Sequence, residues 1–257
     1  MLEALRNAWK IPDLRRRIKY TALMLLLFRM GTFIPVPRMD PAAVRSIVER
    51  GALLGFFDII AGGAFSQFSV FAMSITPYIN ASIIMQLLTI VIPRLEELAK
   101  EGEAGRKIIA QYTRYGTVIL GLIQATGLSI GFKSAMKPGF LSNIVVIVSL
   151  TAGTAFLMWL GEQITDKGIG NGISLLIFAG IVSRIPASIY QTYALIKVGS
   201  LNIFMLLILA VLGIAVIVGV IAVQEAERRV PVQYAKRIVG RRVYGGQSTH
   251  IPIKINS

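Results

Sequence analysis

The sequence predicts an all-α fold, a polytopic membrane helical bundle with six transmembrane helices, and three observations support this prediction. Of the 257 residues, 54% are hydrophobic and only 16% are charged, too few to give a soluble domain of this size a polar surface. The apolar residues gather in long stretches. The basic residues gather on alternate loops between these stretches, so we expect lipid to cover much of the surface.

The apolar stretches approach the ~20 residues that an α-helix needs to cross a ~30 Å hydrocarbon core. Short loops separate them, as in a bundle whose chain crosses the membrane repeatedly. The stretches run Ile18 to Ile34, Phe68 to Ile92, Thr117 to Ile130, Leu141 to Leu160, Ile173 to Tyr193 and Leu201 to Val223. We expect each stretch to be one span.

The basic residues predict the orientation, because cytoplasmic loops carry an excess of Lys and Arg. The richer set of loops holds Arg6, Lys10, Arg15, Arg16, Arg17, Lys19, Arg94, Lys100, Arg106, Lys107, Arg114, Lys167, Arg228, Arg229, Lys236, Arg237, Arg241, Arg242 and Lys254. The opposite set holds only Arg38, Arg45, Arg50, Lys133, Lys137, Arg184 and Lys197. We therefore place both termini in the cytoplasm, and we attribute most of the net charge of +14 to topology rather than nucleic-acid binding.

The predicted membrane interior argues against catalysis and ion coupling. Arg29 is the one charged residue expected well inside a span, whereas ion-coupled transporters hold acidic or basic groups at mid-depth. The single histidine, His250, excludes a two-histidine zinc motif, and the absence of cysteine excludes a thiolate site. We expect no enzymatic activity and no cofactor. A six-span solute permease and a membrane assembly scaffold remain as alternatives.

Glycine and proline predict irregular backbone around the second stretch. Pro77 falls in its middle, where it would break the helical hydrogen-bond ladder at membrane depth. Before it, the segment Gly51 to Phe65 is apolar after Asp58 and contains Gly62 and Gly63, which suits a short helix that re-enters a cavity. An extended, glycine-flexed start to the second span is the alternative.

Four motifs carry a resemblance to a known family. They are Gly161 to Ser174 (GEQITDKGIGNGIS), Pro77 to Leu88 (PYINASIIMQLL), Glu101 to Tyr115 (EGEAGRKIIAQYTRY) and Tyr234 to Pro252 (YAKRIVGRRVYGGQSTHIP). Together and in this order they resemble the SecY family from Leu14 to Asn256. The resemblance implies the central, pore-forming subunit of a protein-conducting channel, which passes unfolded secretory polypeptides across the membrane and releases membrane segments into the bilayer.

The family has ten spans in two pseudo-symmetric halves, and this chain carries six. The resemblance implies a first half-bundle over residues 1–193, containing spans one to five and a plug over about 59–69. The sixth span over 194–227 starts the second half, and residues 228–257 form a cytoplasmic loop that precedes the family's seventh span.

The resemblance also assigns an apolar pore ring to Ile75, Ile79, Ile173 and Ile177. Each pair is four residues apart, so its side chains share one helix face. A ring of methyl groups would close around any translocating sequence and exclude ions by dewetting. Ordinary helix packing is the alternative explanation for these isoleucines.

The plug and the lateral gate complete the implied channel. The plug residues are Ile60, Gly62, Gly63, Ala64 and Phe65, whose apolar and glycine-rich character suits a weakly packed, movable element. Asn80 and Gln124 match polar positions of the lateral gate, where an interhelical hydrogen bond contributes only about 0.6 kcal/mol. Routine bonding between helices is the alternative.

The last cytoplasmic segment, Arg228 to Lys254, alternates basic and apolar residues and predicts a protruding hairpin. The resemblance implies that it contacts the SecA motor ATPase or the ribosome through Lys236, Arg237, Arg241 and Arg242, because arginine forks pair with carboxylates or phosphates. Topology and lipid headgroup contact are the alternative. Further implied partners are the SecE and SecG subunits, signal peptides, nascent polypeptides and the bilayer of the cell inner (plasma) membrane.

Overall fold

The computed structural model describes residues 10–51, 54–55, 58–59, 61–199, 202–232, 237–239, 242–244 and 249–254. Within these ranges, only the backbone is described for residues 49–50, 140, 203, 237–239, 242–244 and 249. The chain divides into two compact units, Met1–Ala187 and Ser188–Ser257.

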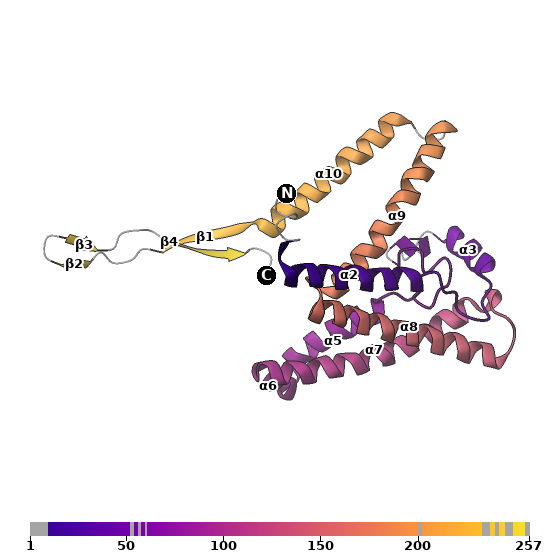
Figure 1. Cartoon of the computed structure of the whole chain (residues 1–257), viewed down its shortest axis with the longest axis horizontal. Helices are drawn as coiled ribbons and strands as arrows, with labels where there is room; N and C mark the ends of the chain where they lie inside the picture. Colours follow the sequence, from indigo (N-terminus) through magenta and orange to yellow (C-terminus); the bar gives the residue numbers. More distant parts are fainter. Residues whose placement is uncertain are drawn as a thin grey trace. The chain divides into compact units, whose positions relative to one another are not determined.

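The first unit is helical (Figure 1). Its elements are α2 (Pro12–Gly31), α3 (Pro41–Arg50), α5 (Thr76–Val91), α6 (Pro93–Lys100), α7 (Glu103–Gly131), the 3-10 helix η1 (Lys133–Ala135), α8 (Phe140–Lys167) and the first part of α9 (Gly172–Lys197). The second unit holds the end of α9, α10 (Ile203–Glu225) and the strands β1 (Glu227–Val232), β2 (Arg237–Val239), β3 (Arg242–Tyr244) and β4 (Thr249–Lys254).

The fold class is confirmed, since each predicted span overlaps a helix. Among the described residues, α8, α9 and α10 are long and apolar enough to cross a membrane, and the bent pair of α5 and α6 would make a fourth span. The helices α2 and α7 are less apolar, because Arg15, Arg16 and Arg17 begin the former and Arg106, Lys107 and Arg114 lie in the latter. Their crossing of the membrane stays a prediction.

Proline begins several helices, as expected for a residue with a fixed φ and no N–H to satisfy. Pro12, Pro41, Pro77 and Pro93 all lie in the first turn of a helix. The prediction that Pro77 interrupts a span is therefore wrong, because α5 starts at Thr76. Pro93 ends α5 instead, and the chain bends by 101° between α5 and α6. At the end of α6, Lys100 Nζ donates to Glu96 Oε1 (2.6 Å).

The core of the first unit centres on α8, which contacts α2, α5 and α7. Val146, Leu150, Leu157, Leu160 and Ile164 are fully buried, and their spacing of three, four or seven residues places them along one stripe of the helix. Gly153 lies on the same helix, where a β-carbon would overlap the carbonyl oxygen of Val70. The α8 helix is therefore packed closely against the segment that precedes α5.

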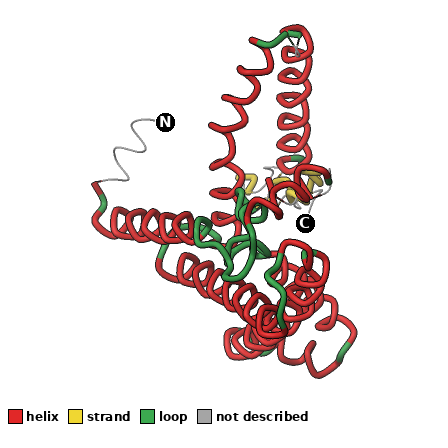
Figure 2. Tube along the Cα trace, turned by 90° about the vertical axis from the view of Figure 1, so that its right-hand side faces the viewer, coloured by secondary structure: helices red, strands yellow, loops and turns green. Residues whose placement is uncertain are grey.

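That preceding segment, residues 61–75, is a run of turns (green in Figure 2). The short helix predicted over 59–69 is thus absent from residues 61–69, and Ile60 lies outside the described residues. Phe68 is fully buried and Ala64 is 1% exposed, so these residues are part of the core, and the movement of the segment stays a prediction. The Phe132 ring packs edge-on against Phe65, with centroids 5.8 Å apart, so aromatic contacts fasten the segment to the end of α7.

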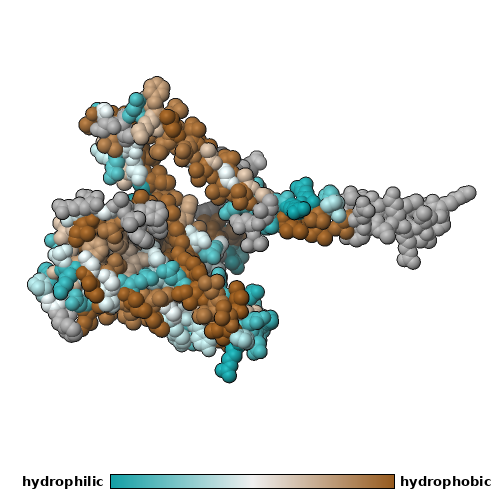
Figure 3. Space-filling model, turned by 180° about the vertical axis from the view of Figure 1, so that it is seen from behind, coloured by the Kyte–Doolittle hydropathy of each residue, from teal (hydrophilic) through white to brown (hydrophobic). Residues whose placement is uncertain are grey.

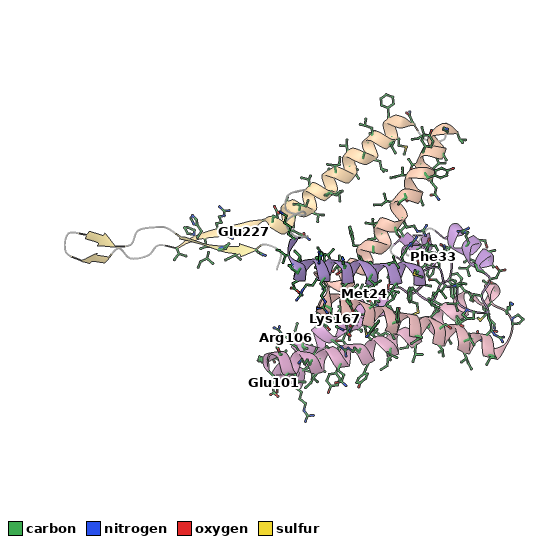
Figure 4. The ribbon with its side chains drawn as sticks, viewed as in Figure 1. Met24, Phe33, Glu101, Arg106, Lys167 and Glu227 are labelled. Carbon is green, nitrogen blue, oxygen red and sulfur yellow. The ribbon has the colours of Figure 1, made fainter. Side chains whose placement is uncertain are left out.

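The loops of the first unit sort to two ends. At one end, the hydroxyl of Tyr20 on α2 donates a hydrogen bond to the side chain of Gln163 on α8 (3.4 Å). At the same end, Arg114 of α7 forms an ion pair with Glu162 of α8 (2.8 Å). Figure 4 shows Glu101, Arg106 and Lys167 at this same end and Phe33 at the other. At the opposite end Arg38 donates to Ser142 (3.2 Å). The segments predicted to be cytoplasmic therefore share one end of the unit, and those predicted to be external share the other.

The second unit contains the most apolar helix. No residue in the apolar window of α10 is buried, and hydrophobic colour covers the helix along its length (Figure 3). A helix that is apolar on all sides is suited to lipid or to contact with other helices. After it, β1 pairs with β4 and β2 pairs with β3, both antiparallel. The predicted hairpin is confirmed, and its strands are the exception to the all-α fold.

Candidate functional site

The plug segment, residues 59–69, contacts both α2 and α9 of the first unit. Gly62 has a φ of +64°, and a β-carbon there would lie 2.8 Å from the Cα of Gly180 on α9. From the other side, Arg29 Nη1 of α2 donates to the carbonyl oxygen of Gly62 (2.8 Å). Glycine is needed at position 62 both for the left-handed backbone and for the close approach to α9.

Charged side chains secure the same segment. The Arg184 guanidinium pairs with the Asp58 carboxylate, which is 8% exposed. The carboxylate also accepts a hydrogen bond from the backbone N–H of Ser66 (2.7 Å). Arg184 was counted above among the residues of the external loops, but it belongs to α9, which continues to Lys197. Arg29 is therefore not the one charge inside a predicted span. The pair of Arg184 and Asp58 is an ionisable pair, and the lack of such a pair was the reason given above for disfavouring a permease.

Three of the four predicted pore-ring residues, Ile75, Ile79 and Ile173, lie in or against one hydrophobic core. Ile75 is 2% exposed and belongs to the core itself. Ile79 from α5 and Ile173 from α9 are partly buried and pack against it, and Ile177 is also partly buried. The backbone N–H of Ile79 donates to the carbonyl of Ile75 (3.1 Å), which fixes these two residues one turn apart. Whether all four line a pore stays a prediction.

An apolar cavity brings together members of three predicted sets. It has a volume of about 540 Å³, and its wall includes Ile79 of the ring, Phe65 of the plug and Gln124 of the gate. Most of the remaining wall is apolar and comes from Leu54, Ala61, Ala72, Met73, Gly127 and Leu128. A site of this kind would accommodate apolar side chains of varied shape, because it offers few fixed hydrogen-bonding groups.

The two gate residues differ in their surroundings. Gln124 is partly buried on α7 and lines the cavity, whereas Asn80 is exposed on α5. The α5 and α7 helices contact each other. The structure therefore supports a position at the cavity edge for Gln124, and the role of Asn80 at a gate stays a prediction.

The loop between α8 and α9 is held by specific contacts that explain the GEQITDKGIGNGIS motif. The N–H of Ile169 donates to the hydroxyl of Thr21 on α2 (3.1 Å), and the N–H of Gly172 donates to that of Thr165 (2.9 Å). A β-carbon at Gly172 would overlap the carbonyl oxygen of Gly161. These glycines let α9 start directly against α8, which places Ile173 at the core edge.

Two of the four predicted partner-binding residues, Arg237 and Arg242, lie in the strands β2 and β3 of the second unit. Arg237 opposes Tyr244, and Val239 opposes Arg242, in the β2–β3 pairing. The side chains of Arg237 and Arg242 lie outside the described part of the chain, and so do Lys236 and Arg241 entirely. The backbone therefore agrees with a hairpin that ends near these arginines, and their contacts stay a prediction.

Sequence reasoning missed the pair of Asp58 and Arg184 and the contact of Arg29 with the plug segment. One signal was available, since Arg184 falls inside the predicted span Ile173 to Tyr193. A charge within a span requires a partner, and Asp58 is the acid nearest to the plug segment in the sequence.

These features define a multi-pass helical membrane protein in which a buried turn segment borders an apolar cavity. The SecY family model matches residues 69–257, and the chain belongs to the SecY family. A protein translocase subunit SecY from Halalkalibacterium halodurans is 51% identical over 100% of this chain and 62% of the relative. One from Escherichia coli K12 is 48% identical over 96% of this chain and 58% of the relative. The chain thus spans about three fifths of these relatives.

Solved structures show the same fold. One titled as the structure of a protein conducting channel has a TM-score of 0.63 at 22% identity, and the match covers 93% of this chain and 52% of the other. Another, Sec61 in the canine ribosome-channel complex from the endoplasmic reticulum, has a TM-score of 0.60 at 21% identity, covering 85% of this chain and 49% of the other.

Proposed function

We propose that this chain forms the amino-terminal part of a protein-conducting channel that passes unfolded polypeptides across a membrane. The single observation that carries the proposal is the apolar cavity of about 540 Å³, where Ile79, Phe65 and Gln124 meet. A channel for unfolded chains must accept any side chain, and an apolar, adaptable wall does so without fixed hydrogen bonds. Membership of the SecY family supports the same function.

The channel supplies a path and no chemistry of its own, so energy must come from a partner. A SecA-type motor ATPase or the ribosome, docked on the basic hairpin, would provide it. The similarity in fold to the Sec61 of a ribosome-channel complex supports a cytoplasmic docking surface. SecE and SecG subunits would cover helix faces that this chain leaves exposed, such as α10, and signal peptides would enter beside Gln124.

The sorted loops support an orientation for the channel. Residues Arg114 and Lys167 lie at the end predicted to be cytoplasmic, and Arg38 lies at the other. By the positive-inside rule, both termini of this chain face the cytoplasm, and the protein resides in the cell inner membrane. The plug segment then lies toward the outer side, because it contacts the last turns of α2.

Reconstitution tests the proposed function. Vesicles are prepared with this chain alone or with this chain and a separate four-span carboxy-terminal half of a SecY relative, and motor, ATP and a signal-bearing substrate are added. We expect protease-protected substrate only when both halves are present. Protected substrate with this chain alone, or none with both halves although both insert, would contradict the proposal.

A further inference from the structure

Two arginines reach the plug segment from different helices. Arg184 lies about 18 Å along α9 from its start at Gly172, given a rise of 1.5 Å per residue. This position is well inside a membrane-spanning helix, where a charged side chain is retained only with a partner or a function. Arg29 lies in the last turn of α2. Because the arginines stand on separate helices, together they bridge α2 and α9 through the segment between them.

Asp58 is the central group of these contacts. Its carboxylate faces the guanidinium of Arg184, whose Nε and Nη2 atoms are buried. The same carboxylate accepts a hydrogen bond from the backbone N–H of Ser66 (2.7 Å), and the backbone carbonyl of Asp58 accepts one from the N–H of Gly63 (3.0 Å). Asp58 therefore ties the turns of the plug segment to one another and to α9 at once. Loss of its charge would remove the ion pair with Arg184 and weaken the hydrogen bond from Ser66, because a charged acceptor makes the stronger bond.

Arg29 completes the arrangement on the other side of the segment. Its Nη1 donates to the carbonyl oxygen of Gly62 (2.8 Å) and lies within reach of the Thr32 hydroxyl (3.5 Å), while its guanidinium stacks over the Phe33 ring at 4.8 Å. A carbonyl in a turn has no partner within a helix or sheet ladder, so the arginine satisfies a group that would otherwise be buried without a hydrogen bond.

We propose that Arg29, Asp58 and Arg184 form a polar latch that holds the plug segment between α2 and α9 and that opens when water reaches it. This inference rests on the proposed channel function and names the groups that keep the channel closed. The latch is reversible for a physical reason: an ion pair is strong in a low-dielectric site and weak in water. Entry of a hydrated polypeptide beside the segment would therefore weaken the contacts that hold it.

Single-cysteine labelling tests the latch directly, because the chain has no cysteine of its own. The reporter is Ala64→Cys, at a position in the plug segment that is 1% exposed. Membrane vesicles carrying the chain are treated with a membrane-impermeant maleimide. We expect slow labelling in the parent and about tenfold faster labelling, equivalent to about 1.4 kcal/mol, after Arg184→Gln, Asp58→Asn or Arg29→Gln. Arg184→Lys keeps the charge and should stay close to the parent.

Two controls make the result decisive. Arg45→Gln removes an exposed neighbouring arginine and should leave the labelling of position 64 unchanged. A second reporter, Val146→Cys, lies at a fully buried site of α8 and should stay protected in every variant. Unchanged labelling of position 64 in Arg184→Gln and Asp58→Asn would overturn the latch. Labelling of position 146 as well would also overturn it, because the charges would then hold the whole fold. Neither result depends on translocation, so the channel function is tested separately.

Discussion

At the scale of single residues, two glycines show how the plug segment is fitted to its neighbours. Gly62 combines a φ of +64° with an approach to Gly180 that leaves no room for a β-carbon, whereas Gly127 on α7 has nothing within 4 Å of that position. The two sites therefore respond differently to the same methyl group, because only the first one carries both a backbone and a packing requirement.

Gly62→Ala should destabilise the first unit by about 2 kcal/mol, since left-handed backbone alone costs about 1–2 kcal/mol for a residue with a β-carbon. Gly127→Ala should be neutral or slightly stabilising, because alanine is favoured over glycine in a helix by up to about 1 kcal/mol. Thermal unfolding in detergent, followed by circular dichroism, measures both. Equal midpoints for the two variants would show that the contact with Gly180 is not tight.

The isoleucines at the core edge carry a second prediction at this scale. Replacing Ile79 and Ile173 together by Ser in an assembled channel should raise the resting ion conductance, because a hydrated constriction no longer excludes ions by dewetting. Conductance across a planar bilayer is the measurement. Val148→Ser, on an exposed face of α8, is the matched control. A double variant that conducts no more than this control would remove these isoleucines from the ring.

At the scale of elements, uniform apolar stretches were the easiest to predict. The α10 helix matches Leu201 to Val223 closely, and α8 contains Leu141 to Leu160 and continues to Lys167. A long apolar run surrounded by lipid has to satisfy its backbone as a helix. The stretch Phe68 to Ile92 was predicted correctly only from Thr76 to Val91. Residues 68–75 are as apolar as a span, but they form turns whose amides bond nearby carbonyls, as from Ser74 to Phe71 (2.8 Å). Hydropathy does not distinguish a buried turn from a helix.

The candidate functional site, like the spans, was predicted only in part. The resemblance to the family selected Ile79, Phe65 and Gln124, which line one cavity. Periodicity alone could not distinguish a role in a channel from ordinary helix packing for these residues. The pair of Asp58 and Arg184 could not be predicted from spacing, because its partners lie on distant segments and meet only through the fold. The close approach of Gly62 to Gly180 could not be predicted from the sequence either, since glycine permits both mobility and close contact.

The hairpin carries the prediction for elements. Arg241→Glu with Arg242→Glu should weaken binding of the motor or ribosome about tenfold or more, because charge reversal turns attraction into repulsion at a docking surface. Cosedimentation of membrane vesicles with each partner at physiological salt measures it. Arg228→Glu with Arg229→Glu makes the same change of charge at exposed positions of β1 and should have little effect. Equal loss in both variants would assign the arginines to general electrostatics.

At the scale of the whole molecule, the sorted loops predict how the chain sits in the membrane. Reporter proteins fused after residue 100 or 167 should be cytoplasmic, and those fused after residue 137 should be external, because the basic residues at the first two positions resist translocation. Protease protection in inverted vesicles gives the sidedness of each fusion. A cytoplasmic reporter at residue 137 would show that α7 does not cross the membrane.

The central claim is that this chain lines the path of a translocating polypeptide, and site-specific crosslinking tests it most directly. A substrate with one cysteine is arrested during translocation through an assembled channel whose only other cysteine comes from Ile79→Cys or, as the control, Val148→Cys. The account predicts an oxidation-dependent crosslink from position 79 and none from position 148. Crosslinking at 148 without crosslinking at 79 would contradict it.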